Sequence, residues 1–227
     1  MAGRKHSRGI CAHCGLETTK AAMTRHHAKC PQLLAAIEEA GKAQGERETL
    51  LLLRVQDAYL IDFWLDLEMR GDAKLKKLDD YLRAIWLECC GHMSEFSGGG
   101  WGSVKVGMNR SALDAFQSEG QLTHIYDFGT SSETQIKVLA VRQGRALTKH
   151  PIALLARNKL PEVVCCLCKA AATHMCLECM EETEGEGFLC DEHAQNHPHD
   201  DYGEPLALVN SPRLGLCGYD GPAEPPY

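Results

Sequence analysis

The chain has 227 residues, a net charge of −7 and 44% hydrophobic residues, so it has room for one medium folded domain with smaller attachments. No apolar run approaches the roughly 18 residues of a membrane span, and the basic N-terminus lacks the apolar core of a secretory signal. Twelve cysteines, several in CxxC pairs, then favour thiolate metal ligands in a reducing compartment over a disulfide framework. We therefore expect a cytoplasmic protein with no membrane partner.

Charge is distributed unevenly along the chain. Residues 1–30 carry a net charge of +5, whereas residues 178–204 contain ten acidic residues and neither Lys nor Arg. A basic end can meet phosphate, and an acidic end repels it. The basic residues predicted to contact nucleic acid are Arg4, Lys5, Arg8, Lys20, Arg25 and Lys29.

The first metal motif lies in the predicted domain of residues 1–31. Its first half, Cys11-x2-Cys14, is a knuckle that supplies two thiolates, and Gly15 suits the tight turn after it. Its second half, His26-x3-Cys30, places two donors on one face of a short helix near residues 19–29. His27 offers another register with poorer helical geometry. The arrangement resembles the small C2HC zinc fingers, in which an Arg-His-x3-Cys helix end follows the knuckle.

A helical linker is predicted over residues 32–48, and an α+β domain over residues 49–160. Residues 50–55 form an apolar run, and residues 60–69 alternate as a half-buried strand does, with Leu65, Leu67 and Met69 on one side. Residues 73–88 predict an amphipathic helix, and residues 111–116 a helical turn. Residues 122–128 and 134–142 predict a hairpin, and residues 151–157 a last strand. The expected fold class is α+β, with a small mixed or antiparallel sheet and one main amphipathic helix.

Two motifs in this domain carry a family resemblance. They are His92-Met93-Ser94-Glu95-Phe96 and His124-Ile125-Tyr126-Asp127-Phe128-Gly129. With the order of strands and helix around them, residues 49–145 resemble the plasmid pRiA4b ORF-3-like proteins, some of which are labelled transposon resolvase-like (the IS1096-type TnpR label). The resemblance implies the fold and suggests a mobile element. After the glycine the family pattern has Asp, Trp and His, where this chain has Thr130, Ser132 and Thr134.

Asp127 and Gly129 have a structural interpretation that needs no chemistry. The carboxylate of Asp127, at a turn, is expected to accept hydrogen bonds from backbone N–H groups. Gly129 is expected to take a positive φ.

The last predicted domain, residues 161–227, is rich in cysteine and histidine. Its donors are Cys165-x2-Cys168, Cys176-x2-Cys179, Cys190-x2-His193, His197 and His199. The order of pairs resembles treble-clef and B-box-like modules, whose chelating pairs interleave. That resemblance implies one site of Cys165, Cys168, Cys190 and His193. A second would combine Cys176 and Cys179 with His197 and His199, or with His174 or Cys217 in place of a late histidine. A single zinc in this module stays an alternative, so the chain is expected to hold two or three Zn²⁺.

Thiolate-rich knuckles give closed structural sites, and the His-x-Glu with Pro-Cys-x-x-Cys signature of zinc deaminases is absent from the sequence. The sequence therefore favours a non-enzymatic zinc-binding adaptor, whose basic finger contacts nucleic acid and whose acidic module contacts protein. One alternative is a purely protein-interacting or inhibitory module. Another is a mobile-element recombinase or a zinc hydrolase, for which the chain shows no active-site signature.

Overall fold

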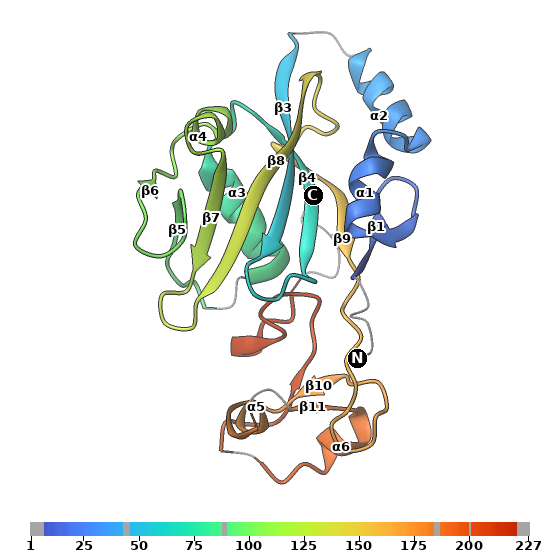
Figure 1. Cartoon of the computed structure of the whole chain (residues 1–227), viewed down its shortest axis with the longest axis vertical. Helices are drawn as coiled ribbons and strands as arrows, with labels where there is room; N and C mark the ends of the chain where they lie inside the picture. Colours follow the sequence, from blue (N-terminus) through green and yellow to red (C-terminus); the bar gives the residue numbers. More distant parts are fainter. Residues whose placement is uncertain (1–6, 43–45, 88–89, 184–186, 200, 222–227) are drawn as a thin grey trace.

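The computed structural model describes residues 7–42, 46–87, 90–183, 187–199 and 201–221. Its main part is one large sheet with helices on both faces (Figure 1). The strands of this sheet are β1 (Arg8–Cys11), β2 (Glu17–Thr19), β3 (Glu48–Asp57), β4 (Trp64–Arg70), β5 (Ser94–Ser97), β6 (Lys105–Val106), β7 (Gln121–Tyr126), β8 (Ser132–Gly144) and β9 (Ile152–Asn158). The helices packed on it are α1 (Lys20–His27), α2 (Pro31–Gly41), α3 (Leu75–Leu82), which continues as the π-helix η1 (Arg83–Leu87), and α4 (Ala112–Glu119).

The strand order is β2-β1-β9-β4-β3-β8-β7-β5-β6, and every neighbouring pair is antiparallel. Helices with antiparallel sheets confirm the expected α+β class. The sheet is larger than expected because β1 of the finger pairs with β9, with Gly9 opposite Asn158. This pairing joins two segments far apart in sequence, and the three predicted boundaries between the four segments stay predictions.

The main hydrophobic core lies between one face of the sheet and the helices α3, η1 and α4. Apolar residues recur at helical spacing in α3, and Leu78 and Leu82 are fully buried there. They pack in the same cluster as Leu65 and Leu67 of β4, with Trp86 of η1. The amphipathic pattern of residues 73–88 thus folds as predicted, although its last turn is a π-helix.

The opposite face of the sheet is also covered. Trp64 of β4 is fully buried in a second cluster with Met23 of α1 and Leu33 of α2. Six of the seven residues of β4 are therefore buried, and the prediction of a half-buried strand is wrong. The polar residues that suggested a solvent-exposed face, Asp66 and Glu68, are instead buried with partners from other strands.

The C-terminal part forms a smaller unit at one end of the molecule (Figure 1). A three-stranded antiparallel sheet has the order β11-β10-β12, and two short helices flank it. The elements here are β10 (His174–Met175), α5 (Leu177–Glu182), β11 (Phe188–Leu189), α6 (Asp191–Gln195), β12 (Leu206–Ala207) and the 3₁₀ turn η2 (Leu216–Gly218). The described helices include none that is both long and apolar enough to cross a membrane.

The tail after β12 returns to the main core. Ser211 Oγ donates a hydrogen bond to the carbonyl of Trp86 at 2.5 Å, and Tyr219 Oη donates to the carbonyl of Ala84 at 2.8 Å. Arg213 is 1% exposed, and its guanidinium donates to Asp127 Oδ2 at 3.2 Å. The tail therefore belongs to the packed body.

The side chain of Asp127 stabilises the turn at Tyr126–Gly129. Its Oδ1 accepts hydrogen bonds from the N–H groups of Gly129 at 3.0 Å and Thr130 at 3.3 Å, which confirms the predicted capping role. The expectation of a positive φ at Gly129 is wrong, because Asp127 itself takes that conformation, with φ of 64°. An Asp side chain bonded to its own following backbone tolerates the left-handed region.

Candidate metal centres

The twelve predicted metal ligands come together in three groups of four. They are Cys11, Cys14, His26 and Cys30; Cys165, Cys168, Cys190 and His193; and Cys176, Cys179, His197 and His199. Within each group the sulfur and nitrogen atoms that can bind a metal all lie within 4.8 Å of one another. The part of the chain that the structure describes therefore has three Cys/His groups positioned to hold metal ions.

The first group is assembled by the finger. The knuckle that contains Cys11 and Cys14 connects β1 to β2, and Gly15 takes the expected positive φ of 72° after it. His26 lies in the last turn of α1, and Cys30 is the N-cap of α2, where Pro31 begins the next helix. Cys14 Sγ lies 3.2 Å from His26 Nε2, and Cys11 Sγ lies 3.9 Å from Cys30 Sγ.

The second and third groups interleave. The second combines the knuckle before β10 with Cys190, the N-cap of α6, and His193 within that helix, and the third combines the start of α5 with two histidines that follow α6. His193 Nδ1 is 3.2 Å from Cys190 Sγ and 3.5 Å from Cys165 Sγ. Cys179 Sγ is 3.2 Å from both His197 Nε2 and His199 Nδ1. Each group takes one early pair and one late pair, so metal binding would tie the whole module together.

These distances fit tetrahedral coordination. A tetrahedron with metal–sulfur bonds of about 2.3 Å has edges of about 3.8 Å, and edges that include nitrogen are slightly shorter. The measured separations run from 3.2 to 3.9 Å. A disulfide would need its sulfurs about 2.05 Å apart, and all the cysteines in the described ranges are free.

The pKa values of three cysteines show whether their surroundings favour or oppose ionisation of the thiol. Burial opposes ionisation of Cys165, but N–H groups of the knuckle and of Cys190 outweigh it and lower its pKa to about 6. Burial raises the pKa of Cys11 to about 11, and burial together with the neighbouring Cys176 does the same for Cys179. A cation would offset these costs, because a metal-bound cysteine is held as the thiolate.

The two alternative ligands in the C-terminal module belong to none of the three groups. His174 Nδ1 lies 2.9 Å from Thr173 Oγ1, and Cys217 Sγ accepts from the buried guanidinium of Arg213 at 3.5 Å.

His27, the other register considered for the finger, faces the sheet. Its Nε2 lies 2.8 Å from Oδ2 of Asp66, a fully buried carboxylate on β4. Arg54 of β3 donates to both oxygens of Asp66, and its NH2 also donates to Thr24 Oγ1 at 3.0 Å. Sequence reasoning missed this network, which fixes α1 against the main sheet. The available sequence signal for such a network was the pair of acidic residues, Asp66 and Glu68, at alternate positions of β4.

The six basic residues predicted to contact nucleic acid differ in their positions and partners in the structure. Arg4 and Lys5 lie outside the described residues. Arg8 forms an ion pair with Glu17 at 2.8 Å, and Lys20 donates to Gln56 and to the carbonyl of Ile61. Arg25 and Lys29 are exposed on and just after α1. Two of the four described residues therefore have structural contacts, and two face solvent.

No family model matches the chain, and no curated protein matches it. Among solved structures, the chain is similar to a protein of unknown function, MM3350 from Methanosarcina mazei Go1. The match covers 46% of this chain and 67% of that protein, with 15% sequence identity and a TM-score of 0.39.

Proposed function

We propose that the protein is a non-enzymatic, zinc-dependent adaptor whose acidic C-terminal module binds another protein. The observation that supports the zinc part is the composition of the three groups, each with four protein donors. Thiolate and imidazole donors at tetrahedral spacing are those that zinc prefers. Four protein ligands leave no position for a catalytic water, so the sites suit a structural role.

The C-terminal module is small, and metal binding would be its main source of stability. Its described core consists of Cys165, Cys176, Leu189 and Cys190, so three of the four buried residues are candidate ligands. Zinc binding to such a module contributes about 10–16 kcal/mol at neutral pH, which offsets the conformational entropy of ordering it.

The module is held firmly enough to present a surface. The chain enters the module after β9 and leaves it at Asn210, and two asparagines join these two segments by hydrogen bonds. Asn158 Nδ2 donates to Asn210 Oδ1 at 2.7 Å, and Asn210 Nδ2 donates to the carbonyl of Asn158 at 2.7 Å. A fixed module loses little entropy when it binds a partner.

The surface of the module suits a basic protein partner. Residues 178–204 contain ten acidic residues and no cation, of which Glu184, Glu186 and Asp200 lie outside the described residues. Exposed apolar residues of the same module, Leu167 at 62% and Tyr202 at 61%, could supply contact area. A long acidic run attracts cationic surfaces and repels nucleic acid.

Nucleic-acid binding by the finger is the second candidate, favoured by the exposure of Arg25 and Lys29. Since α1 is docked on the sheet, the finger would bring the whole body to the nucleic acid. We further propose kinship of the α+β domain with the pRiA4b ORF-3-like family, on the sequence motifs alone.

Both halves can be tested with charge variants of the zinc-loaded chain. For the protein half, we would compare quantitative affinity capture by the wild type, by Glu181→Gln/Glu182→Gln, and by the control Glu38→Gln/Glu39→Gln on α2. The proposal expects at least one basic protein to be recovered by the wild type and the control and lost with the module variant. Equal recovery by all three would refute the acidic surface.

For the nucleic-acid half, a mobility-shift assay at low salt would compare the wild type with Arg25→Gln/Lys29→Gln. Binding that weakens in this variant and with rising salt supports the second candidate. No shift by the intact zinc-loaded protein would refute it.

A further inference from the structure

The α+β domain contains a hollow of about 470 Å³ that lies away from the metal groups. It opens where α3 and η1 meet β5, the edge strand β6 and the turn after β7. Its volume falls within the usual range of small-ligand sites, about 300–1,000 Å³. The walls that matter below are Met93, Met108 and Phe128 on the apolar side and Lys76 and Lys105 on the charged side.

The floor of the hollow is a buried polar network around Asp79, which is 1% exposed. Its Oδ1 accepts from Ser94 Oγ at 2.6 Å and from His124 Nε2 at 2.8 Å, and its Oδ2 accepts from Lys76 Nζ at 2.7 Å. Burial alone would raise the pKa of Asp79, but these hydrogen bonds outweigh it and hold the pKa far below its usual range. Burial lowers the pKa of His124, so its imidazole is neutral and donates from Nε2. Both carboxylate oxygens are occupied, and the floor has little affinity left for a cation.

The helix above this floor is irregular. Arg83 begins the π-helix, and its guanidinium donates to Asp79, to Ser94 Oγ at 2.7 Å and to the carbonyl of His92 at 2.7 Å. Single turns of π-helix are rare and occur frequently at functional sites. Arg83 lies four residues after Asp79, the spacing at which helix side chains meet, and its guanidinium therefore reaches the floor of the hollow where the π-helix begins.

The rim is apolar and exposed. The exposed fraction is 68% for Met93, 48% for Trp101 and 37% for Phe128, and the rings of Trp101 and Phe128 meet edge to face with centroids 5.1 Å apart. Exposed aromatic and methionine side chains grouped at a hollow are typical of a binding surface.

The accessible charge at the mouth is positive. The side chains of Lys76 and Lys105 are 50% and 73% exposed, although Lys76 pairs with Asp79 and Asp80 and Lys105 pairs with Glu95. The two carboxylates that line the hollow, Asp79 and Glu95, are only 1% and 13% exposed, and Asp80, at 40%, is not part of the lining, so the exposed charges that line the hollow are the ammonium groups. An incoming anion would therefore find cations at the mouth and apolar atoms along the wall.

We propose that this hollow binds a small amphipathic anion, with its apolar or aromatic body against Met93, Met108 and Phe128 and its acidic head between Lys76 and Lys105. The site is separate from the zinc groups, and it adds a ligand-binding activity to the proposed adaptor.

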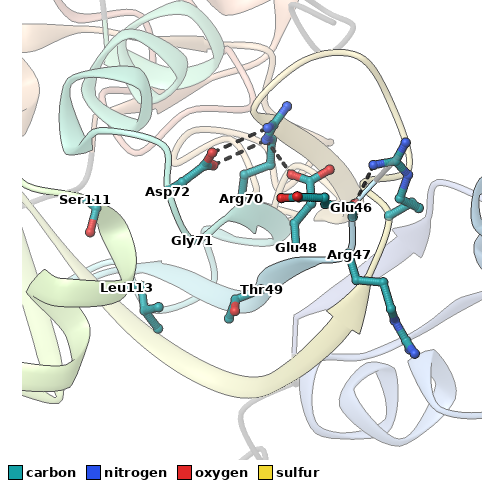
Figure 2. A pocket seen from close by; sticks show the side chains of 10 residues that line it. Glu46, Arg47, Glu48, Thr49, Arg70, Gly71, Asp72, Ser111 and Leu113 are labelled. Carbon is teal, nitrogen blue, oxygen red and sulfur yellow. Dashed lines mark hydrogen bonds and ion pairs between the residues drawn. The ribbon is translucent and has the colours of Figure 1, made fainter. Parts of the chain in front are cut away.

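A second hollow, of about 570 Å³, is less suited to a ligand (Figure 2). Its central cation, Arg70, is held between two carboxylates, 2.7 Å from Glu48 and 3.3 Å from Asp72 (Figure 2). The positive and negative side chains that line it balance, and apolar residues are scarce there.

The test uses 1-anilinonaphthalene-8-sulfonate, an aromatic sulfonate whose fluorescence rises in apolar surroundings, with the zinc-loaded full chain. The proposal expects saturable binding at one site, weakened about tenfold or more by Phe128→Ser because an apolar wall is lost. Lys105→Gln should weaken binding about threefold, since one exposed charge contributes little. The control variants Val141→Ser and Lys137→Gln remove an exposed apolar residue and an exposed cation from β8, and they should change the affinity less than twofold.

Energy transfer locates the bound probe. Trp101 is the tryptophan whose ring contacts Phe128 at the rim, so Trp101→Phe should reduce the transfer. If circular dichroism shows that Phe128→Ser does not fold, Met93→Ser serves in its place. Non-saturable binding, equal effects of the site and control variants, or equally tight binding of neutral N-phenyl-1-naphthylamine would overturn the proposal.

Discussion

One buried carboxylate, Asp66, contributes to the docking of the finger on the sheet, beside the β1–β9 pairing and the apolar cluster around Trp64. In the variant Asp66→Ala, the guanidinium of Arg54 on β3 would lose its carboxylate partner on β4, although the Arg54 side chain is only 11% exposed. Asp66 accepts two hydrogen bonds from Arg54 and one contact from His27, and all three would disappear. Removing one partner of a buried ion pair costs about 3–5 kcal/mol, because the other charge stays buried without compensation. That is a large share of the roughly 5–15 kcal/mol by which a domain is stable.

The assay is urea unfolding of the zinc-loaded protein, followed by tryptophan fluorescence. One of the three tryptophans, Trp64, lies within the interface, 4.9 Å from the Arg54 guanidinium, so its part of the signal reports undocking. The paired variant Arg54→Met/Asp66→Leu should cost less than Asp66→Ala alone, because it removes both charges and keeps apolar volume.

The matched control is Glu39→Ala, which removes an exposed ion pair with Lys42 on α2. It should change the unfolding free energy by about 0.5 kcal/mol or less. If Asp66→Ala cost less than about 1 kcal/mol, or no more than Glu39→Ala, the finger would not be held by this network and the reasoning would fail.

Three further outcomes follow from the structure. Gly9→Ala would place a Cβ 2.4 Å from the Trp64 ring and 2.6 Å from the Arg157 carbonyl, so urea unfolding should show a loss of about 1–3 kcal/mol, whereas Gly41→Ala meets no atom within 4 Å and should be neutral or slightly stabilising. Arg213→Met leaves the Asp127 carboxylate without its buried partner, so it should cost about 3 kcal/mol and expose the tail after β12 to limited proteolysis; a tail as resistant as in the wild type would contradict this. The folded pKa of Asp79 lies below its unfolded value, so its contribution is complete above about pH 4 and declines as the pH falls further. The stability difference between the wild type and Asp79→Asn, measured by urea unfolding, should therefore shrink from pH 5 to pH 3, and a difference that grows would show the wrong sign.

Local sequence patterns predicted the parts of the molecule whose causes are local. The knuckle spacing identified candidate metal ligands that the fold does bring together, because two donors with two residues between them converge within one turn of the chain. Helical periodicity identified α3, and alternation with turn residues identified the β7–β8 hairpin. The interleaving of the C-terminal pairs came from a resemblance, since spacing alone does not say which knuckles share an ion.

Contacts between distant segments escaped prediction because they leave no periodic signal. Asp66 and Glu68 alternate with apolar residues as solvent-facing residues do, yet Arg54 from the neighbouring strand β3 and Arg142 from β8, one strand further, neutralise them in the interior. The same holds for Arg213, which looks like a surface residue of a turn-rich tail and lies beneath the Tyr126 ring with Asp127. The sequence predicted the turn at Asp127, but it gave no signal that Arg213 pairs with the Asp127 carboxylate.

Metal content and coordination, measured together on protein purified without added metal, test the three-zinc proposal most directly. Elemental analysis should give three zinc ions per chain, and X-ray absorption should show four-coordinate zinc with eight sulfur and four nitrogen ligands shared among the three ions. Fewer than three zinc ions, or a zinc with three protein ligands and a water, would contradict the proposal of three closed structural sites.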